Sequence, residues 1–305
     1  MKSVVDHIVF IVKDLNRSIE NYKILLGRNP SWKGSHPAFK TQNALFRLNN
    51  TYIELLADAY EDGESTETKA ESTFVRDYLA RNKPGLAGLC FGTTNAVEMV
   101  SHMQGVGIGA LGPMQGEGKN DLSGAVRRWL NVFWPNSASR GLWTFGIQHL
   151  DPIDTLPMSP PLASPFGTNC DDMSIEAVDH VVIQTTNLEA AKRFYGEALG
   201  IRLALELPDH PFGHLLFFKT TTDHKMVLEV MQPKSSNADD HGEDKYWGIS
   251  YQTKNVEATQ ERLVTCGVKV SEIRKGMKPG TIVCTVKSHN LGVPTLLIGP
   301  DATKM

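Results

Sequence analysis

The strongest constraint in this sequence is a segment that occurs twice. The run VVDHIVFI at 4–11 returns as AVDHVVI at 177–183. Each copy is followed by an amphipathic segment that ends in Gly, and later by a strand-like run with one acid, Glu54 in the first half and Glu229 in the second. The two Asp-His pairs are 173 residues apart (179 − 6) and the two acids 175 (229 − 54). A repeat of this length predicts that the chain folds as two related halves.

Each half is built from two units of the same plan. Four helical segments are predicted at 14–27, 95–105, 187–200 and 255–267, each with Asp or Asn at its start and Gly at its end. Asp and Asn accept hydrogen bonds from first-turn amides, and Gly adopts the left-handed conformation that ends a helix. Strands are predicted before these helices at 4–12, 87–93, 178–185 and 246–253. Strands are predicted after them at 38–39, 44–48, 51–56, 125–133, 142–150, 202–207, 214–220, 225–231, 269–273, 281–286 and 295–298. The sequence therefore predicts an α+β fold of four β-α-β-β-β modules.

The domain organisation is read from the segment that separates the halves. Residues 151–175 contain five prolines and little periodicity, which is typical of a linker. We expect one domain at 1–150 and a second at 176–305, each with two modules. Two acidic loops, at 58–73 and 232–245, lie at equivalent places and are expected to be solvated.

Composition excludes several classes of protein. The 305 residues are 41% hydrophobic and 21% charged, as in globular proteins, and the net charge of −3 gives no reason to expect nucleic acid or an anionic membrane as partner. No apolar stretch approaches the roughly 20 residues of a membrane span. The four cysteines have no paired spacing, so neither a disulfide framework nor a zinc knuckle is predicted, and a reducing cytoplasm is expected.

The repeated strands carry polar residues where the pattern is otherwise apolar. Side chains alternate between the faces of a strand, so His7 is expected on one face with Val5, and Asp6 on the other. Glu54 is likewise flanked by apolar neighbours on its own face. A buried carboxylate costs several kcal/mol unless it is paired, ligated or protonated. Each His and Glu are thus expected to face each other, a metal ion or a cavity; the plain alternative is a hydrogen bond that satisfies the core.

These motifs resemble the vicinal oxygen chelate superfamily. The resemblance is carried by VDHIV at 5–9 with DL at 14–15 and LG at 26–27, and by VDH at 178–180 with LG at 199–200. The run at 34–44 followed by YIEL at 52–55 is similar, more narrowly, to uncharacterised glyoxalase-like domains. The superfamily includes glyoxalase I, extradiol dioxygenases, fosfomycin-resistance enzymes and bleomycin-binding proteins.

The resemblance implies a fold and a site. Two modules would wrap eight strands around an open cleft, where a His of the first strand and a Glu of the fourth hold a divalent ion such as Zn, Ni, Mn or Fe. His7 with Glu54, and His180 with Glu229, match those positions. The ion would chelate two neighbouring oxygens of a small-molecule substrate. A homodimer stays open by analogy alone.

The second and fourth modules depart from this pattern. They have Gly88 and Gly248 where a His would fall, so the ligand set of glyoxalase I or of an extradiol dioxygenase is incomplete. His36 and His210, each followed by Pro, are further candidates for contacting the site, and two His with one carboxylate would suit iron or another divalent ion.

The second module offers two more candidates. Its last strand has Gln148 or His149 as a contact, and we name Gln148 as a substrate-binding residue. Trp129 belongs to an aromatic-rich stretch that would form an apolar pocket, with Arg127 or Arg128 for an acidic substrate group.

Three functions follow from these observations. The first is a metal-dependent enzyme of lyase or isomerase type, in which Glu54 or Glu229 moves a proton on an oxygen-rich or aromatic compound. The second is a ring-cleaving or other non-haem iron dioxygenase. The third is a metal-free protein that binds an aromatic ligand, as bleomycin-binding relatives do.

Overall fold

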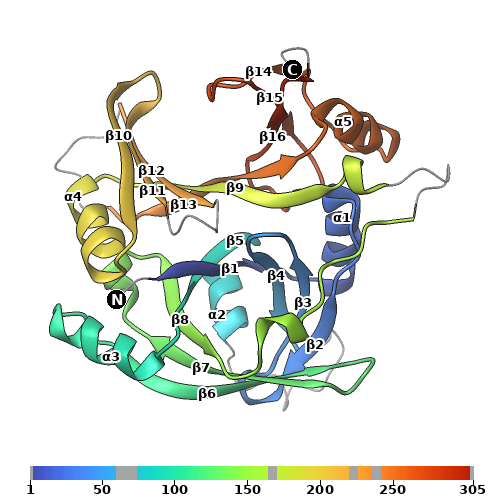
Figure 1. Cartoon of the computed structure of the whole chain (residues 1–305). Helices are drawn as coiled ribbons and strands as arrows, with labels where there is room; N and C mark the ends of the chain where they lie inside the picture. Colours follow the sequence, from blue (N-terminus) through green and yellow to red (C-terminus); the bar gives the residue numbers. More distant parts are fainter. Residues whose placement is uncertain (1–2, 60–73, 164–169, 220–225, 235–241, 303–305) are drawn as a thin grey trace.

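The computed structural model describes residues 3–59, 74–163, 170–219, 226–234 and 242–302. Strands of the first half close into a barrel in the order β1-β4-β3-β2-β6-β7-β8-β5 (Figure 1). Their bounds are β1 Val4–Ile11, β2 Trp32–His36, β3 Thr41–Arg47, β4 Tyr52–Asp58, β5 Gly85–Gly92, β6 Leu111–Asn120, β7 Val126–Phe133 and β8 Trp143–His149. The short β2–β6 pairing, through Gly34 and Ser35, closes the ring.

Strands of the second half form an open sheet in the order β10-β11-β12-β9-β13-β16-β15-β14. Their bounds are β9 Ile175–Gln184, β10 Arg202–His210, β11 Gly213–Lys219, β12 Val227–Pro233, β13 Lys245–Thr253, β14 Arg274–Lys275, β15 Thr281–Val286 and β16 Thr295–Pro300. The edge strand β14 has two residues, where its counterpart β6 in the barrel has ten. The second half thus repeats the strand order of the first without closing.

The four β-α-β-β-β modules predicted from the sequence are confirmed. Their helices are α1 Leu15–Leu26, α3 Ala96–Gly105, α4 Leu188–Ala191 with the π-helical segment η6 Lys192–Ala198, and α5 Val256–Thr265. The predicted Asp and Asn side chains accept hydrogen bonds at all four helix starts. Gly27 ends α1 at φ 68°, in the left-handed region that Gly adopts without strain.

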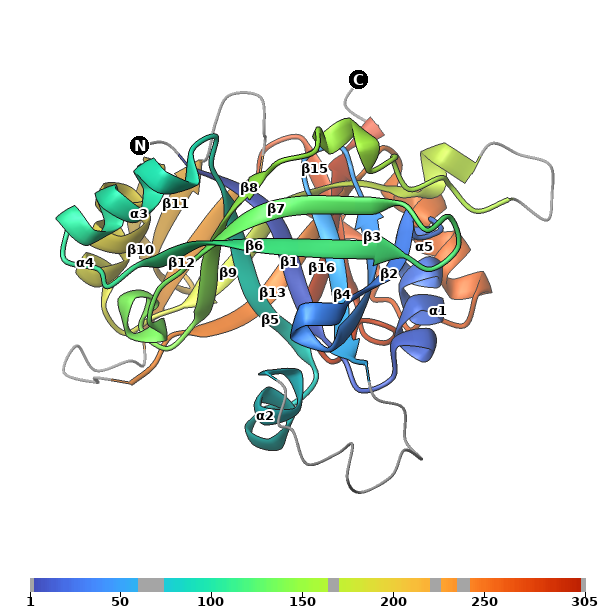
Figure 2. The ribbon, with the colours of Figure 1, turned by 90° about the horizontal axis from the view of Figure 1, so that it is seen from below.

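Some strand predictions are wrong. Residues 38–39 lie in a single 3₁₀ turn (η1, Pro37–Phe39) because Pro37 starts a turn, and the strand lies earlier, at β2. Strand β6 was not predicted, since its glycines give it little strand propensity; pairing with β7 holds it in place. The run at 269–273 contributes one isolated bridge, at Val270. Helix α2, Phe74–Arg81, was also missed, and it lies at one end of the barrel (Figure 2).

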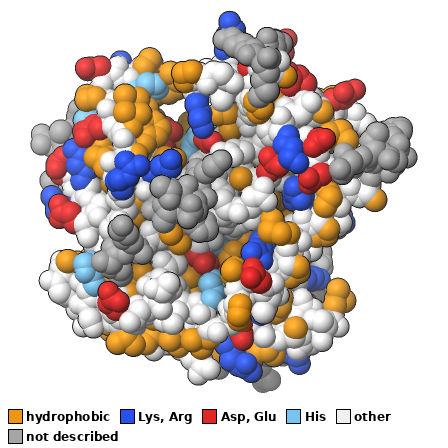
Figure 3. All heavy atoms as spheres, viewed as in Figure 1, with side chains coloured by type: hydrophobic (Ala, Val, Ile, Leu, Met, Phe, Trp, Pro, Cys, Tyr) orange, Lys and Arg blue, Asp and Glu red, His pale blue; other side chains and the backbone are white. Residues whose placement is uncertain are grey.

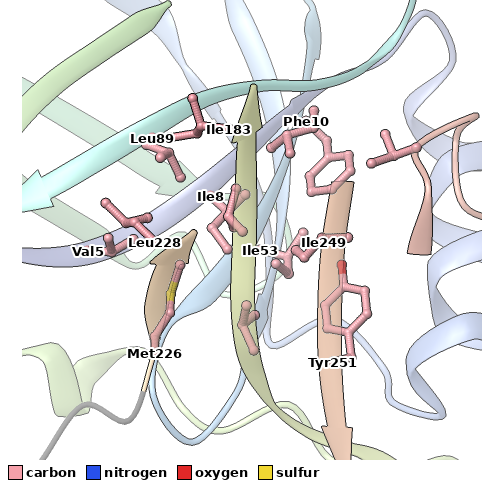
Figure 4. Close-up of a cluster of buried hydrophobic side chains, with 14 of the residues drawn as sticks. Val5, Ile8, Phe10, Ile53, Leu89, Ile183, Met226, Leu228, Ile249 and Tyr251 are labelled. Carbon is pink, nitrogen blue, oxygen red and sulfur yellow. The ribbon is translucent and has the colours of Figure 1, made fainter. Parts of the chain in front are cut away.

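The main core lies between the barrel and the open sheet. Val5, Ile8 and Phe10 on the outer face of β1 pack with residues of the second half such as Ile183 and Tyr251 (Figure 4). Both faces of β1 are therefore covered, one by the other half and one by the barrel interior. This explains its nearly continuous apolar sequence.

The segment predicted as a linker lies along the barrel. The Ser159 amide donates to the Arg47 carbonyl, and the Leu162 amide to the Gly27 carbonyl. Leu156 is fully buried and packs with Trp32, Leu45 and Tyr52 near one barrel end. Within the described part of the chain, no helix is both long and apolar enough to cross a membrane. Most of the two acidic loops lies outside the described residues.

Candidate functional site

The barrel encloses a cavity of about 510 Å³. Its walls are largely aromatic, and its polar side chains come mainly from β1, β4 and β3 on one side and β7 on the other. The face viewed along the barrel axis is hollowed, with hydrophobic side chains around the hollow (Figure 3). The aromatic lining residues are Trp32, Phe39, Tyr52, Phe74, Trp129, Phe133, Trp143 and Phe145. Its volume is typical of a site for a small organic molecule.

A β-bulge in β1 decides which polar groups reach this cavity. Val5 pairs with Phe91 of β5 and His7 with the preceding residue, Cys90, so Asp6 is an extra residue in the strand. The bulge places Val5 in the outer core and brings Asp6 and His7 together on the inner side. The sequence predicted His7 and Val5 on one face of the strand and Asp6 on the other. That prediction is wrong, because it assumed an uninterrupted alternation of side chains along β1.

Asp6 binds two histidines. Its carboxylate oxygens lie 2.7 Å from Nδ1 of His7 and 2.9 Å from Nε2 of His149. Burial alone would raise the pKa of Asp6, but the hydrogen bonds from His149 and His7 outweigh burial and hold it far below its usual range. Asp6 is therefore ionised, and it accepts a hydrogen bond from the protonated Nδ1 of His7. This leaves Nε2 of His7 directed at the cavity.

Nε2 of His7 faces the carboxylate of Glu54. The distance to Oε2 of Glu54 is 3.5 Å, and both side chains are buried. With Nδ1–H of His7 donating a hydrogen bond to Asp6, a neutral His7 would turn the lone pair of Nε2 toward an oxygen that also carries lone pairs. Two such atoms attract only when a proton or a cation lies between them. The pair is thus a place where positive charge is stabilised.

Asn43 extends this cluster to His36. The amide Nδ2 of Asn43 donates to Oε1 of Glu54 at 2.7 Å and lies 3.1 Å from Nε2 of His36. Nδ1 of His36 lies 3.0 Å from the Thr41 hydroxyl. Burial lowers the pKa of His36, which favours the neutral imidazole that can accept from Asn43 or bind a metal. Oδ1 of Asn43 is buried and has no hydrogen-bond partner among the described residues.

The second module contributes aromatic rings instead of ligands. Gly88 pairs with Trp143 as His7 pairs with Tyr52, which puts Phe145 at the position that corresponds to Glu54. A Cβ atom on Gly88 would lie 2.5 Å from the Trp143 ring. The indole therefore occupies the space that a histidine of this strand would need.

The donors of the first module fit a divalent ion. His7 and Glu54 offer an imidazole nitrogen and a carboxylate oxygen 3.5 Å apart, which leaves coordination positions for a substrate. His36 is joined to Glu54 through Asn43, and the ligand atoms of His7, Glu54 and His36 do not all lie within 4.8 Å of one another. The Asp6 bond to Nδ1 of His7 is the arrangement that orients metal-binding histidines. Among the described residues, three such ligand atoms lie within 4.8 Å of one another only at Asp6, His7 and Cys90. Burial raises the pKa of the Cys90 thiol, so that second grouping is the poorer one.

The sequence-predicted residues separate into two groups. His36 and Trp129 line the same cavity as His7 and Glu54. Gln148 does not line it. Its Oε1 instead accepts from the Ala96 amide at the start of α3. Alternation along β8 gives the cavity position to His149, so the choice of Gln148 is corrected. Asn43 and Asn131 were not predicted, although both lie on strands that face the cavity.

The second half repeats the motif at the open sheet. A matching bulge puts Asp179 2.8 Å from Nδ1 of His180, and Nε2 of His180 lies 3.7 Å from Glu229. Burial raises the pKa of Glu229, while the charges of His180 and His210 act in the opposite direction. Nδ1 of His210 accepts from the Phe212 amide at 3.4 Å. These side chains are more exposed than their counterparts in the barrel.

Comparison with known families defines the class of protein. Residues 5–167 match the model of the glyoxalase-like domain. Residues 179–285 match the model of the glyoxalase/bleomycin resistance protein/dioxygenase superfamily. The chain therefore belongs to the glyoxalase-like domain family, within the vicinal oxygen chelate superfamily.

Three solved structures share this fold over nearly the whole chain. A hypothetical protein from Staphylococcus aureus has a TM-score of 0.63 and 14% identity, covering 97% of this chain and 98% of that chain. A mutant of 4-hydroxymandelate synthase from Streptomyces coelicolor has a TM-score of 0.66 and 13% identity, covering 98% of this chain and 93% of that chain. The Mn(II)-bound glyoxalase from Novosphingobium aromaticivorans has a TM-score of 0.62 and 10% identity, covering 98% of this chain and 83% of that chain. A search of curated proteins gave no significant match. Identities this low establish the fold alone.

Proposed function

We propose that this chain is a metal-dependent, glyoxalase-like enzyme of lyase or isomerase type. It would act on a small oxygen-rich or aromatic compound inside the barrel. The observation that supports this most directly is the 3.5 Å approach of Nε2 of His7 to Glu54 in an enclosed cavity, with the other nitrogen of His7 held by an ionised Asp6. A catalytic metal needs such a set of donors with open positions.

His7 and Glu54 would hold the ion, and His36 would contact the substrate. When bound, a divalent ion supplies Lewis-acid polarisation of a substrate carbonyl or hydroxyl oxygen. Asp6 orients the His7 ring, and Asn43 holds one oxygen of Glu54 by a 2.7 Å hydrogen bond. Glu54 is then positioned to accept a proton from a carbon next to the polarised oxygen and return it elsewhere. The walls around this exchange are largely aromatic.

The structural neighbours are consistent with two reaction types. One is a Mn(II)-bound glyoxalase and another a 4-hydroxymandelate synthase. We place the glyoxalase-like reaction first and keep the non-haem iron dioxygenase as the alternative, because an imidazole and a carboxylate suit either metal.

A metal-free binding protein is the second candidate function. It is favoured by the Trp143 and Phe145 rings, which replace the ligands expected from the second module. A site with only one module's ligands binds metal less firmly than a full set. An aromatic cavity of this size would still bind an organic ligand.

Metal content separates these functions. In protein purified without chelator we expect bound Zn, Ni or Mn, measured by mass spectrometry of the metals. Glu54→Gln should lower the affinity for that metal by about tenfold or more, because the amide is a weaker ligand than the carboxylate. Glu229→Gln, the equivalent change in the open sheet, is the matched control and should leave the barrel site unchanged.

Other outcomes identify the alternatives. Bound iron together with consumption of oxygen would favour the dioxygenase. Equal and negligible metal in all three proteins, with ligand binding unaffected by EDTA, would reject the metalloenzyme in favour of the binding protein.

A further inference from the structure

Arg127 of β7 is a buried cation to which the described residues supply no partner. It lines the cavity and is 6% exposed. Among the residues that the structure describes, its guanidinium makes no hydrogen bond or ion pair, and Nε is fully enclosed. Arginine stays protonated in proteins, so burial cannot be relieved by loss of the proton. A buried, unpaired charge is costly, and such a cost is retained where a ligand completes the pair.

The two acids near the cavity, Asp6 and Glu54, interact with residues other than Arg127. Asp6 accepts from His7 and His149, and Glu54 accepts from Asn43 and faces His7. Neither lies within ion-pair distance of Arg127. Arg127 lines the same cavity as Tyr52, whose ring stacks on His7 at 4.5 Å. The donors of the guanidinium are therefore available to a ligand.

The place of Arg127 in the barrel defines how a ligand would lie. In the closed strand order β7 is four strands from β4, so Arg127 and Glu54 are on opposite walls. Figure 2 shows β6 and β7 in front of β1 and β4. A ligand that spans the cavity would have one end at His7 and Glu54 and the other at Arg127.

The residues that follow on the same face of β7 suit an organic body. The Trp129 ring lies against Gly116 and Gly118 of β6, where any side chain would meet the indole. Asn131 is 3% exposed, lines the cavity and, like Arg127, makes no side-chain hydrogen bond among the described residues. The β7 wall thus offers a cation, an aromatic plane and an amide in a row.

We propose that Arg127 binds an anionic group of the substrate, so that the cavity selects small aromatic organic acids over their uncharged analogues. The carboxylate of such a compound would accept paired hydrogen bonds from the guanidinium, and its ring would lie against Trp129. A hydroxyl or carbonyl oxygen would point at His7 and Glu54. The position of the ligand oxygen at His7 and Glu54 rests on the proposed function, while the binding of the anionic group rests on Arg127 alone.

Binding of a matched pair of probes tests the inference. Mandelate is an aromatic 2-hydroxy acid, and mandelamide is its uncharged amide. Their affinities for EDTA-treated protein are measured from the fluorescence of the cavity tryptophans. We expect the wild-type protein to bind mandelate at least about tenfold more tightly than mandelamide. Arg127→Gln should weaken mandelate binding by about 10- to 100-fold, the range for hydrogen bonds to charged groups, and mandelamide binding by less than about threefold.

Two further variants provide controls. Arg127→Lys keeps the charge without the paired geometry and should retain part of the preference for the acid. Arg128→Gln changes the neighbouring arginine, which is half exposed and lies 3.4 Å from Glu117 outside the cavity; neither affinity should change. Metal content should be the same in all of these variants, because Arg127 is not a ligand. The test therefore stands apart from the test of the metal site.

Three outcomes would overturn the inference. They are equal affinity of the wild-type protein for the two probes, including no detectable binding of either; equal weakening of both probes by Arg127→Gln; and a large fall in the melting temperature of ligand-free Arg127→Gln. The last would mean that Arg127 supports the fold. A variant that loses only the charge preference, at an unchanged or higher melting temperature, supports it.

Discussion

Asp6 carries more of this site than its position in the sequence indicates. One extra residue in β1 turns its carboxylate inward, where it binds both His7 and His149. An alternating pattern places Asp6 on the far face, and no residue type in the run marks a bulge. The repeated Asp-His pair at 179–180 is the signal that was available, because an acid written twice next to a candidate ligand suits an orienting role.

Replacement of Asp6 by Asn tests that role. We expect Asp6→Asn to lower the affinity of the barrel site for divalent metal by about 10- to 100-fold, because His7 loses the anionic partner that orients it. The free energy of unfolding at neutral pH should fall by about 2 kcal/mol. Calorimetric metal titration and denaturant unfolding measure the two effects. Asp179→Asn is the matched control, and it should leave the metal affinity of the barrel site as it is.

The same variant has a defined pH dependence. Burial would raise the pKa of Asp6, but hydrogen bonds hold it below the ordinary value of 3.8. An acid with a lowered pKa stabilises the fold above its unfolded pKa, and this stabilisation is lost as the pH falls toward the folded pKa. The difference in unfolding free energy between wild type and Asp6→Asn should therefore be constant above about pH 5. It should shrink below pH 3.8. A difference that grows on acidification would contradict this.

At the scale of elements, local signals predicted the helices well and the strands unevenly. Asp14 and Asn255 accept hydrogen bonds at the starts of α1 and α5, as their sequence positions indicated. Such caps depend on residues next to each other in the chain. Strand β6 is glycine-rich and depends on pairing with β7, the next strand in the chain, and with β2, which is remote in sequence. The contact of Gln148 was likewise not predicted, because its partner, the Ala96 amide, lies on α3.

Gln148 should matter for stability and not for ligand binding. Gln148→Ala removes the acceptor for the Ala96 amide and is expected to lower the free energy of unfolding by about 1 kcal/mol. Gln148→Glu keeps an acceptor and adds favourable charge at the helix N-terminus, so its stability should equal or exceed that of wild type. Metal content and mandelate binding should be unchanged in both. Weaker probe binding by Gln148→Ala at unchanged stability would restore the site role.

At the scale of the whole molecule, the two halves share one hydrophobic core and several buried polar contacts. Arg262 of α5 donates to the Ile24 and Leu25 carbonyls at the end of α1, at 2.6 and 3.2 Å, and to the Met173 carbonyl at 2.8 Å. A cation at a helix C-terminus is favoured by the helix dipole as well. The division into domains at 1–150 and 176–305 stays a prediction. Each half buries an apolar face in the shared core, and exposure of that face to water would be unfavourable.

Arg262 should therefore stabilise both halves together. We expect Arg262→Ala to lower the free energy of unfolding by about 3 kcal/mol, since three carbonyls lose a charged donor. Unfolding should stay a single transition when followed by far-UV circular dichroism and by tryptophan fluorescence. Arg193→Ala, at an exposed arginine of η6, is the control without effect. Two separate transitions in the wild-type protein would show that the halves unfold independently.

The sequence by itself determined the repeated modules, the helix ends and the pairing of His7 with Glu54, because these follow from local hydrogen bonding, side-chain periodicity and repetition. Only the tertiary structure decided that the first half closes and the second stays open, since closure depends on β2 meeting β6 across the ring. It also decided the inward turn of Asp6, the outward turn of Gln148 and the isolation of Arg127. Each of these depends on what packs beside the residue, which is contributed by segments distant in the chain.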